Sequence, residues 1–173
     1  MSRWGWAIRL IIANVAVFVL LSSNTVPAEV FSRMALVPSE AWRAPWTFVT
    51  YMFLHGGIGH LFFNMLALYF FGPELEARLG GPAFLGLYFI SGVTGGLLSL
   101  LLAPNAAIIG ASGAVFGVML GYAWFWPRNR ILIWGIIPIG ARYLVLLMTA
   151  ISLWSGNGWS GTGCCCANGV CGR

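Results

Sequence analysis

The sequence contains neither lysine nor aspartate, and charged residues of any kind are scarce. All 9 basic residues are arginine, all 4 acidic residues are glutamate, and charged residues make up 8% of the 173-residue chain. A soluble domain carries about 25% charged residues, so this chain could not cover its surface in water. The lack of aspartate excludes a Ser-His-Asp triad and an aspartate-based metal site, and the lack of lysine excludes a lysine nucleophile.

Histidine is almost as scarce, since His55 and His60 are the only two in the chain. Any chemistry that needs an imidazole must therefore use one of them. The arginines lie scattered between apolar runs rather than on one clustered basic face. Nucleic-acid binding requires such a face, so we expect no nucleic-acid partner.

Hydrophobic residues make up 60% of the chain and fall into long runs. A helix needs about 20 mainly apolar residues to cross a bilayer. We therefore expect an all-α, multi-pass membrane protein with five spans, over about 6–23, 55–72, 82–102, 110–126 and 131–154. The first run could also be a signal peptide, but no clear cleavage site follows it, which favours an uncleaved span. The connection 24–46 mixes isolated charges with tryptophan, which is typical of the membrane interface.

Arginine counts predict the orientation, because short cytoplasmic loops collect basic residues. With the N-terminus inside, the bias outside the C-terminal tail is five to two: Arg3, Arg9, Arg78, Arg128 and Arg130 against Arg33 and Arg43. The second and fourth spans then both enter from the outer face. His60 and Ser112 should lie at similar shallow depths below that face.

The last residues, 155–173, differ abruptly from the rest, because they are rich in glycine and hold all 4 cysteines. Three adjacent thiols match no zinc-ligand spacing, and lipidation of these cysteines has no further support. We expect a transmembrane domain over 1–154 followed by a disordered tail, or by a segment translated out of frame. We expect no metal and no cofactor.

Three polar residues, His60, Asn64 and Ser112, lie inside apolar runs, where polar side chains are costly and often functional. His60 and Asn64 are four residues apart, so on a helix they share one face and can point at the same target. Each of them alone could instead form a structural hydrogen bond to a neighbouring helix.

Ser112 lies in the segment Gly110-Ala111-Ser112-Gly113, at the expected start of the fourth span. Flanking glycines allow backbone to approach the serine closely, and the free N–H groups of a helix N-terminus can stabilise an oxyanion. This pattern suits a nucleophile. The glycines at 113, 117 and 121 also form a small-residue face for helix packing, and both interpretations can hold together.

At these residues the sequence resembles a known family. The pattern His55-x4-His60-x3-Asn64, followed by Gly110-x-Ser112-Gly113, is similar to that of the rhomboid intramembrane serine proteases. Two further segments, Trp42-Arg43 and Gly72-Pro73-Glu74-Leu75-Glu76, resemble loop signatures of that family. The resemblance covers about residues 40–153.

The resemblance implies a bundle, usually of six helices, around a water-filled cavity open to the outer side. It implies that Ser112 is the nucleophile, that His60 and Asn64 stabilise the oxyanion, and that Gly110, Gly113 and His55 support the motif. The substrates would be transmembrane proteins, cleaved near the outer boundary of the membrane. Lack of aspartate is compatible with this chemistry, because the family uses a serine–histidine dyad.

The histidine of that dyad is missing from these 173 residues. In the family it lies on the sixth helix, whereas here no histidine follows His60 and no sixth span follows Trp154. A serine hydroxyl without a base is a weak nucleophile, so we expect a serine endopeptidase by family that is inactive as written. A frame disruption near codon 155 is the favoured explanation. The alternative is a natural pseudoprotease that binds client transmembrane helices without cutting them.

A small transporter is a third hypothesis, but the sequence has neither an internal repeat nor paired broken helices. The absence of an organelle-type leader favours the bacterial plasma membrane. The oligomeric state cannot be predicted from the sequence.

Overall fold

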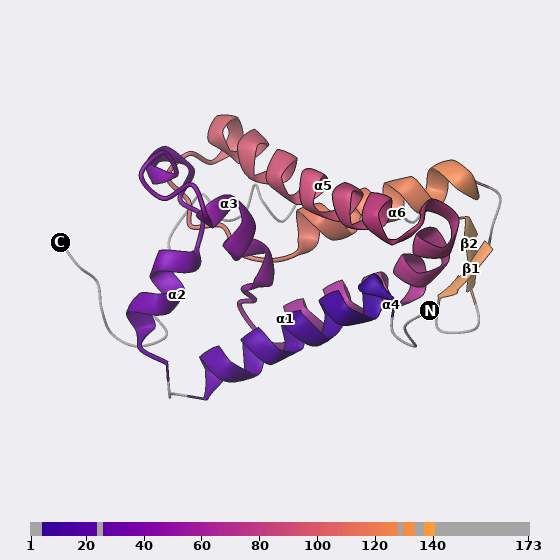
Figure 1. The fold of residues 1–173 in the computed structure, drawn as a ribbon, viewed down its shortest axis with the longest axis horizontal. Helices are drawn as coiled ribbons and strands as arrows, with labels where there is room; N and C mark the ends of the chain where they lie inside the picture. The colour runs from indigo at the N-terminus through magenta and orange to yellow at the C-terminus, as the bar shows by residue number, and fades with distance from the viewer. Residues whose placement is uncertain (1–4, 24–25, 128–129, 134–136, 141–173) are drawn as a thin grey trace.

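The computed structural model describes residues 5–23, 26–127, 130–133 and 137–140 (Figure 1). Most of these residues are helical, as expected. In chain order the elements are α1 (Trp6–Ser22), α2 (Ala28–Met34), the 3-10 helix η1 (Pro38–Glu40), α3 (Thr47–Thr50), the 3-10 helix η2 (Tyr51–Phe53), α4 (Ile58–Leu79), α5 (Gly81–Leu102), α6 (Ser112–Phe125), β1 (Arg130–Ile133) and β2 (Ile137–Gly140).

The long helices pack in pairs. Helix α1 lies beside α4, and α5 lies beside α6, while contacts between α4 and α6 join the two pairs (Figure 1). Fully buried side chains fill the space between the helices, among them Leu68, Leu75, Phe84, Tyr88 and Val118. Many apolar side chains on the outer faces remain exposed, such as Phe62, Phe63 and Leu101. That distribution suits a bundle whose outer surface meets lipid rather than water.

The first four expected spans correspond to α1, α4, α5 and α6. By length and composition alone, one described helix, α5, is long and apolar enough to cross a bilayer. The segment Thr47–Phe53 and helix α4 add a second if this pair, bent by 97°, counts as one span. Helices α1 and α6 are apolar but shorter, with 17 and 14 residues.

Helix α4 continues beyond its expected end at Gly72. We expected the segment Pro73-Glu74-Leu75-Glu76 to lie outside the helix, but α4 runs through Pro73 to Leu79. Glu76 lies on this extension, and its carboxylate accepts hydrogen bonds from the backbone N–H groups of Trp6 (2.8 Å) and Ala7 (3.0 Å). The first N–H groups of a helix have no partner within it, so Glu76 caps α1 and thereby ties the two helix ends together.

The fifth expected span, 131–154, begins differently from the expected helix. Strands β1 and β2 form an antiparallel hairpin in which Arg130 pairs with Gly140 and Ile133 with Ile137. Isoleucine favours extended backbone, and Pro138 cannot donate a helical hydrogen bond, so a helix is disfavoured here. Residues 141–154 and the expected tail, 155–173, lie outside the described residues.

The connection between α1 and α4 contains the short helices α2, η1, α3 and η2. An isolated β-bridge joins Leu36 of this connection to Ile108 of the loop before α6. Two backbone hydrogen bonds form it: Leu36 N–H donates to Ile108 O (3.1 Å), and Ile108 N–H donates to Leu36 O (2.7 Å). The bridge fixes the loop that leads to Ser112 against the first connection.

Candidate active site

Ser112 is the first residue of α6, as its sequence context predicts. Gly110, two residues before it, has a φ of 119°, a conformation that side chains other than glycine's rarely adopt. The helix then begins at once, because Val115 N–H donates to Ala111 O (2.9 Å). The serine therefore stands at a sharp turn from loop to helix, where backbone N–H groups lack helical partners.

His60 lies in the first turn of α4, with its ring against the Ser112 loop. A Cβ atom placed on Gly110 would lie 2.6 Å from Cε1 and 2.8 Å from Nε2 of this ring. A side chain at residue 110 would therefore displace the His60 ring, and the backbone angle independently favours glycine. The starts of α4 and α6, at Ile58 and Ser112, thus lie close together at this point.

His55 supports His60 from the other side. The two rings are 5.2 Å apart between centroids, in an edge-to-face arrangement with an interplanar angle of 64°. His55 is 5% exposed, whereas His60 is exposed. Aromatic pairs favour this geometry, so the buried ring of His55 helps to hold the exposed one in place.

Asn64 lies one turn after His60 and is buried. Its side-chain nitrogen donates to the backbone carbonyl of His60 (2.8 Å). The spacing therefore places both residues on one face of α4, but the Asn64 amide is engaged with its own helix in this structure.

Tyr51 of η2 also reaches the Ser112 segment, although sequence reasoning did not single it out. Its backbone carbonyl accepts a hydrogen bond from Gly110 N–H (2.9 Å), and its hydroxyl donates to Gly92 O of α5 (2.7 Å). A tyrosine in an apolar run gives no sign of such contacts, and one of them uses backbone atoms only. Sequence pattern carried no signal for either.

The glycines of α6 allow it to approach α5 closely, as their spacing predicts. The Cα atom of Gly95 lies 3.8 Å from a Cβ placed on Gly113, and a Cβ on Gly117 would overlap Ser91. Helix packing therefore accounts for the glycine stripe without excluding a chemical role for Ser112, which begins the same helix.

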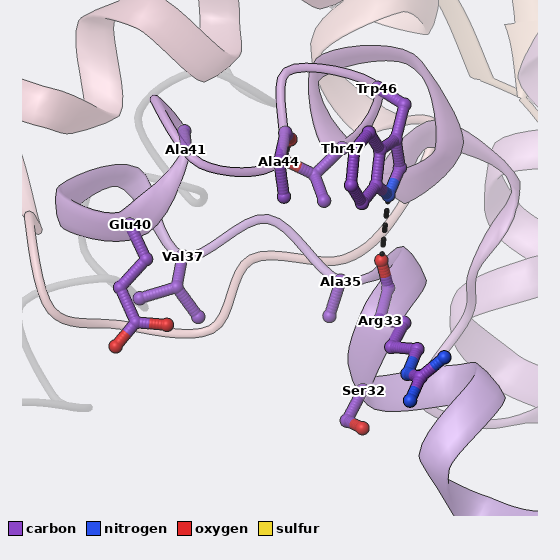
Figure 2. Close-up of a pocket in the computed structure, with 9 residues that line it drawn as sticks. All are labelled: Ser32, Arg33, Ala35, Val37, Glu40, Ala41, Ala44, Trp46 and Thr47. Carbon is purple, nitrogen blue, oxygen red and sulfur yellow. Dashed lines mark hydrogen bonds between the residues drawn. The ribbon is translucent and has the colours of Figure 1, made fainter.

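A pocket of about 410 Å³ lies elsewhere, within the connection before α4 (Figure 2). Trp46 forms one wall, and its indole N–H donates to Arg33 O (3.1 Å). The pocket is lined by Ser32, Arg33, Ala35, Val37, Glu40, Ala41, Ala44, Trp46 and Thr47. None of the residues around Ser112 lines it, so it is separate from the candidate active site. Within the described residues no group of three or more potential metal-ligating side chains occurs.

Comparison with known proteins identifies the family. Residues 41–163 match the sequence profile of the Rhomboid domain. Similar proteins include Rhomboid protease GluP of Bacillus subtilis (strain 168), 33% identical over 129 residues, which are 73% of this chain and 24% of that protein. RHOMBOID-like protein 2 of Arabidopsis thaliana is 43% identical over 108 residues, or 62% of this chain and 33% of that protein. Rhomboid protein 1, mitochondrial, of Saccharomyces cerevisiae (strain ATCC 204508 / S288c) is 33% identical over 118 residues, or 65% and 32%.

The matched part of the chain thus spans between a quarter and a third of the length of these relatives. The profile begins at residue 41, in the connection before α4, and covers every element from α3 to β2, including Ser112, His60 and Asn64. Rhomboid domains are polytopic helical bundles in membranes, and rhomboid proteases are serine peptidases. The chain therefore belongs to the rhomboid family of multi-pass membrane proteins.

Proposed function

We propose that this chain carries the nucleophile and the oxyanion-stabilising groups of a rhomboid-type intramembrane serine endopeptidase. One observation carries the proposal: the ring of His60 packs against Gly110, two residues before Ser112 at the N-terminus of α6. A histidine ring thereby lies against the segment that leads to the serine, at the end of α6 where backbone N–H groups have no helical partners. That is the arrangement needed to hold a tetrahedral oxyanion.

In the proposed reaction, Ser112 Oγ attacks the carbonyl carbon of a peptide bond. The carbonyl π bond breaks, and its electron pair moves to the oxygen, which becomes the oxyanion. His60 and the backbone N–H of Ser112 donate hydrogen bonds to that oxygen. Asn64 joins them when its amide leaves the His60 carbonyl, so its present hydrogen bond is a resting arrangement.

The proton of Ser112 Oγ needs an acceptor, and these 173 residues offer no free candidate. His60 is assigned to the oxyanion, and His55 is buried behind it. No histidine follows His60 in the sequence. We propose that these residues on their own do not hydrolyse peptide bonds, because nucleophile and base act as one unit.

The substrates we propose are transmembrane segments of other proteins, cleaved near the outer boundary of the membrane. The arginine distribution favours a cytoplasmic N-terminus, and a bacterial plasma membrane is the proposed location. The similarity to a protein of Bacillus subtilis supports the bacterial location.

Chemical rescue tests the proposal. The purified chain in detergent is treated with a serine-reactive phosphonate, with and without added imidazole as an external base, and Ser112→Ala is the matched control. We expect no labelling without imidazole, and imidazole-dependent labelling that Ser112→Ala abolishes and His60→Ala lowers by about 10²- to 10³-fold.

Each of the other outcomes contradicts part of the proposal. Ser112-dependent labelling without imidazole would show that the chain has its own base. Labelling that survives in Ser112→Ala would remove Ser112 as the nucleophile. Failure of imidazole to promote any labelling would show that the oxyanion-stabilising groups are not competent.

A further inference from the structure

Tyr51 lies beside the Ser112 segment on both sides of the serine. Before it, the Tyr51 carbonyl accepts the hydrogen bond from Gly110 N–H (2.9 Å). After it, the Tyr51 hydroxyl lies 3.6 Å from a Cβ atom placed on Gly113, which is ordinary van der Waals distance. Gly110 and Gly113, on either side of Ser112, thus lie beside the backbone carbonyl and the hydroxyl of the same tyrosine.

The tyrosine is itself anchored to a third element. Its hydroxyl donates to Gly92 O of α5 (2.7 Å) and lies 3.7 Å from a Cβ placed on Gly95. Tyr51 is 3% exposed, so the hydrogen bond is shielded from water. A buried hydroxyl with a good partner has one preferred position, because leaving the bond unmade costs the desolvation of both groups.

We propose that Tyr51 is a positioning residue, which sets the place of Ser112 relative to His60. Its backbone carbonyl holds Gly110, and its hydroxyl holds α5. The inference rests on the proposed function, because it assigns Tyr51 a part in that site. Gly110 links the two residues. Its N–H donates to the Tyr51 carbonyl, and the His60 ring occupies the space beside its Cα where a Cβ would lie. A movement of Tyr51 therefore moves Gly110 against the ring.

The chain offers a matched control in Tyr122. This residue is also a buried tyrosine, 6% exposed, and its hydroxyl donates to Glu74 Oε2 (3.0 Å). It lies ten residues after Ser112 on α6, or about 15 Å along the helix at about 1.5 Å per residue. Tyr51→Phe and Tyr122→Phe each remove a tyrosine hydroxyl and keep the ring, but only the first change lies beside Ser112.

Histidine resonances provide the decisive measurement. Because the full chain contains 2 histidines, selective ¹³C,¹⁵N-histidine labelling in detergent micelles gives two ring spin systems, and His55→Phe assigns them. We expect Tyr51→Phe to shift the ring signals of His60, and Tyr122→Phe to leave them in place. Unchanged His60 signals in Tyr51→Phe would overturn the inference. Equal shifts in both variants would also overturn it, since they would report general loosening.

Imidazole-rescued labelling of Ser112 is the second readout. We expect Tyr51→Phe to slow it by about tenfold or more, because small misplacements of reacting groups are costly, and Tyr122→Phe to leave it unchanged. Equal labelling rates in Tyr51→Phe and the unaltered chain would overturn the inference. If the unaltered chain shows no labelling, the proposed function fails, whereas the histidine signals still decide whether Tyr51 positions His60.

Discussion

At Gly110 two independent constraints meet on one residue. The backbone angle of 119° disfavours any side chain, and the ring of His60 fills the place that a Cβ would take. The Gly-x-Ser-Gly pattern indicated that backbone approaches the serine, and the structure adds that a histidine ring approaches the first glycine as well. Packing and conformation both require glycine there.

Replacing Gly110 by alanine should therefore destabilise the protein and displace His60. The strained backbone conformation alone costs on the order of 1–3 kcal/mol. The free energy of unfolding in mixed micelles and the His60 ring resonances measure the two effects. Gly86→Ala is the matched control, because a Cβ on Gly86 of α5 meets nothing within 4 Å. Equal stability of Gly110→Ala and Gly86→Ala would contradict this account.

Residue types and spacing indicated His60, Asn64 and Ser112 as candidates, and the structure places the His60 ring against Gly110. The proximity of His60 and Ser112 could be predicted because both residues lie near the starts of spans that are expected to enter the membrane from the same face. The position of the Asn64 amide could not be predicted in this way, since its hydrogen bond to the His60 carbonyl is one of several that the side chain could form. Tyr51 was missed because its contact with Gly110 N–H is made by its backbone carbonyl, which every residue possesses.

At the scale of elements, the apolar runs predicted α1, α5 and α6 with nearly correct ends. The charged residues after Pro73 do not end α4, which runs past the expected end of its span at residue 72. Instead, Glu76 remains on the helix and caps α1 through two backbone N–H groups. A long-range cap of this kind joins residues about 70 positions apart and leaves no local pattern in the sequence. The β1–β2 hairpin was missed because a run of isoleucine suits a strand as well as a membrane helix.

Glu76→Gln should lower the stability of the α1–α4 pair. Glutamine keeps one acceptor oxygen, but its NH₂ group cannot accept the second N–H, and the negative charge at the start of α1 is lost. We expect a loss of about 1 kcal/mol in the free energy of unfolding, measured by denaturant titration in micelles. Glu74→Gln serves as the control, since its remaining oxygen can still accept from Tyr122. The cap would be refuted if both variants lost the same amount.

For the whole molecule, the proposed topology places two surfaces on opposite sides of the membrane. Ser39 is exposed near η1, in the connection that the arginine count places outside, and Ala77 is exposed at the end of α4, on the predicted inner side. Pairing of the first connection with the loop before α6, through Leu36 and Ile108, also groups these two segments at one end. The orientation itself comes from the sequence and not from the fold.

Cysteine labelling tests that orientation. In a variant whose 4 natural cysteines are serine, Ser39→Cys should react with a membrane-impermeant maleimide in intact bacterial cells. Ala77→Cys should react only after the membrane is permeabilised. The reverse pattern would invert the proposed topology and place the Ser112 side of the bundle in the cytoplasm.

The unequal lengths of α5 and α6 have a consequence for the surrounding bilayer. Because Gly113 lies beside Gly95, Ser112 stands level with Gly96, and the last six residues of α5 rise about 9 Å above it. These residues include the exposed leucines Leu97, Leu98, Leu100, Leu101 and Leu102. They form an apolar rim that acyl chains must cover, so hydrophobic mismatch falls on this side of the protein. The length of the lipid chains should therefore affect the depth of Ser112 in the membrane. Thin bilayers should tilt the protein at this rim or bring the serine nearer to the headgroups.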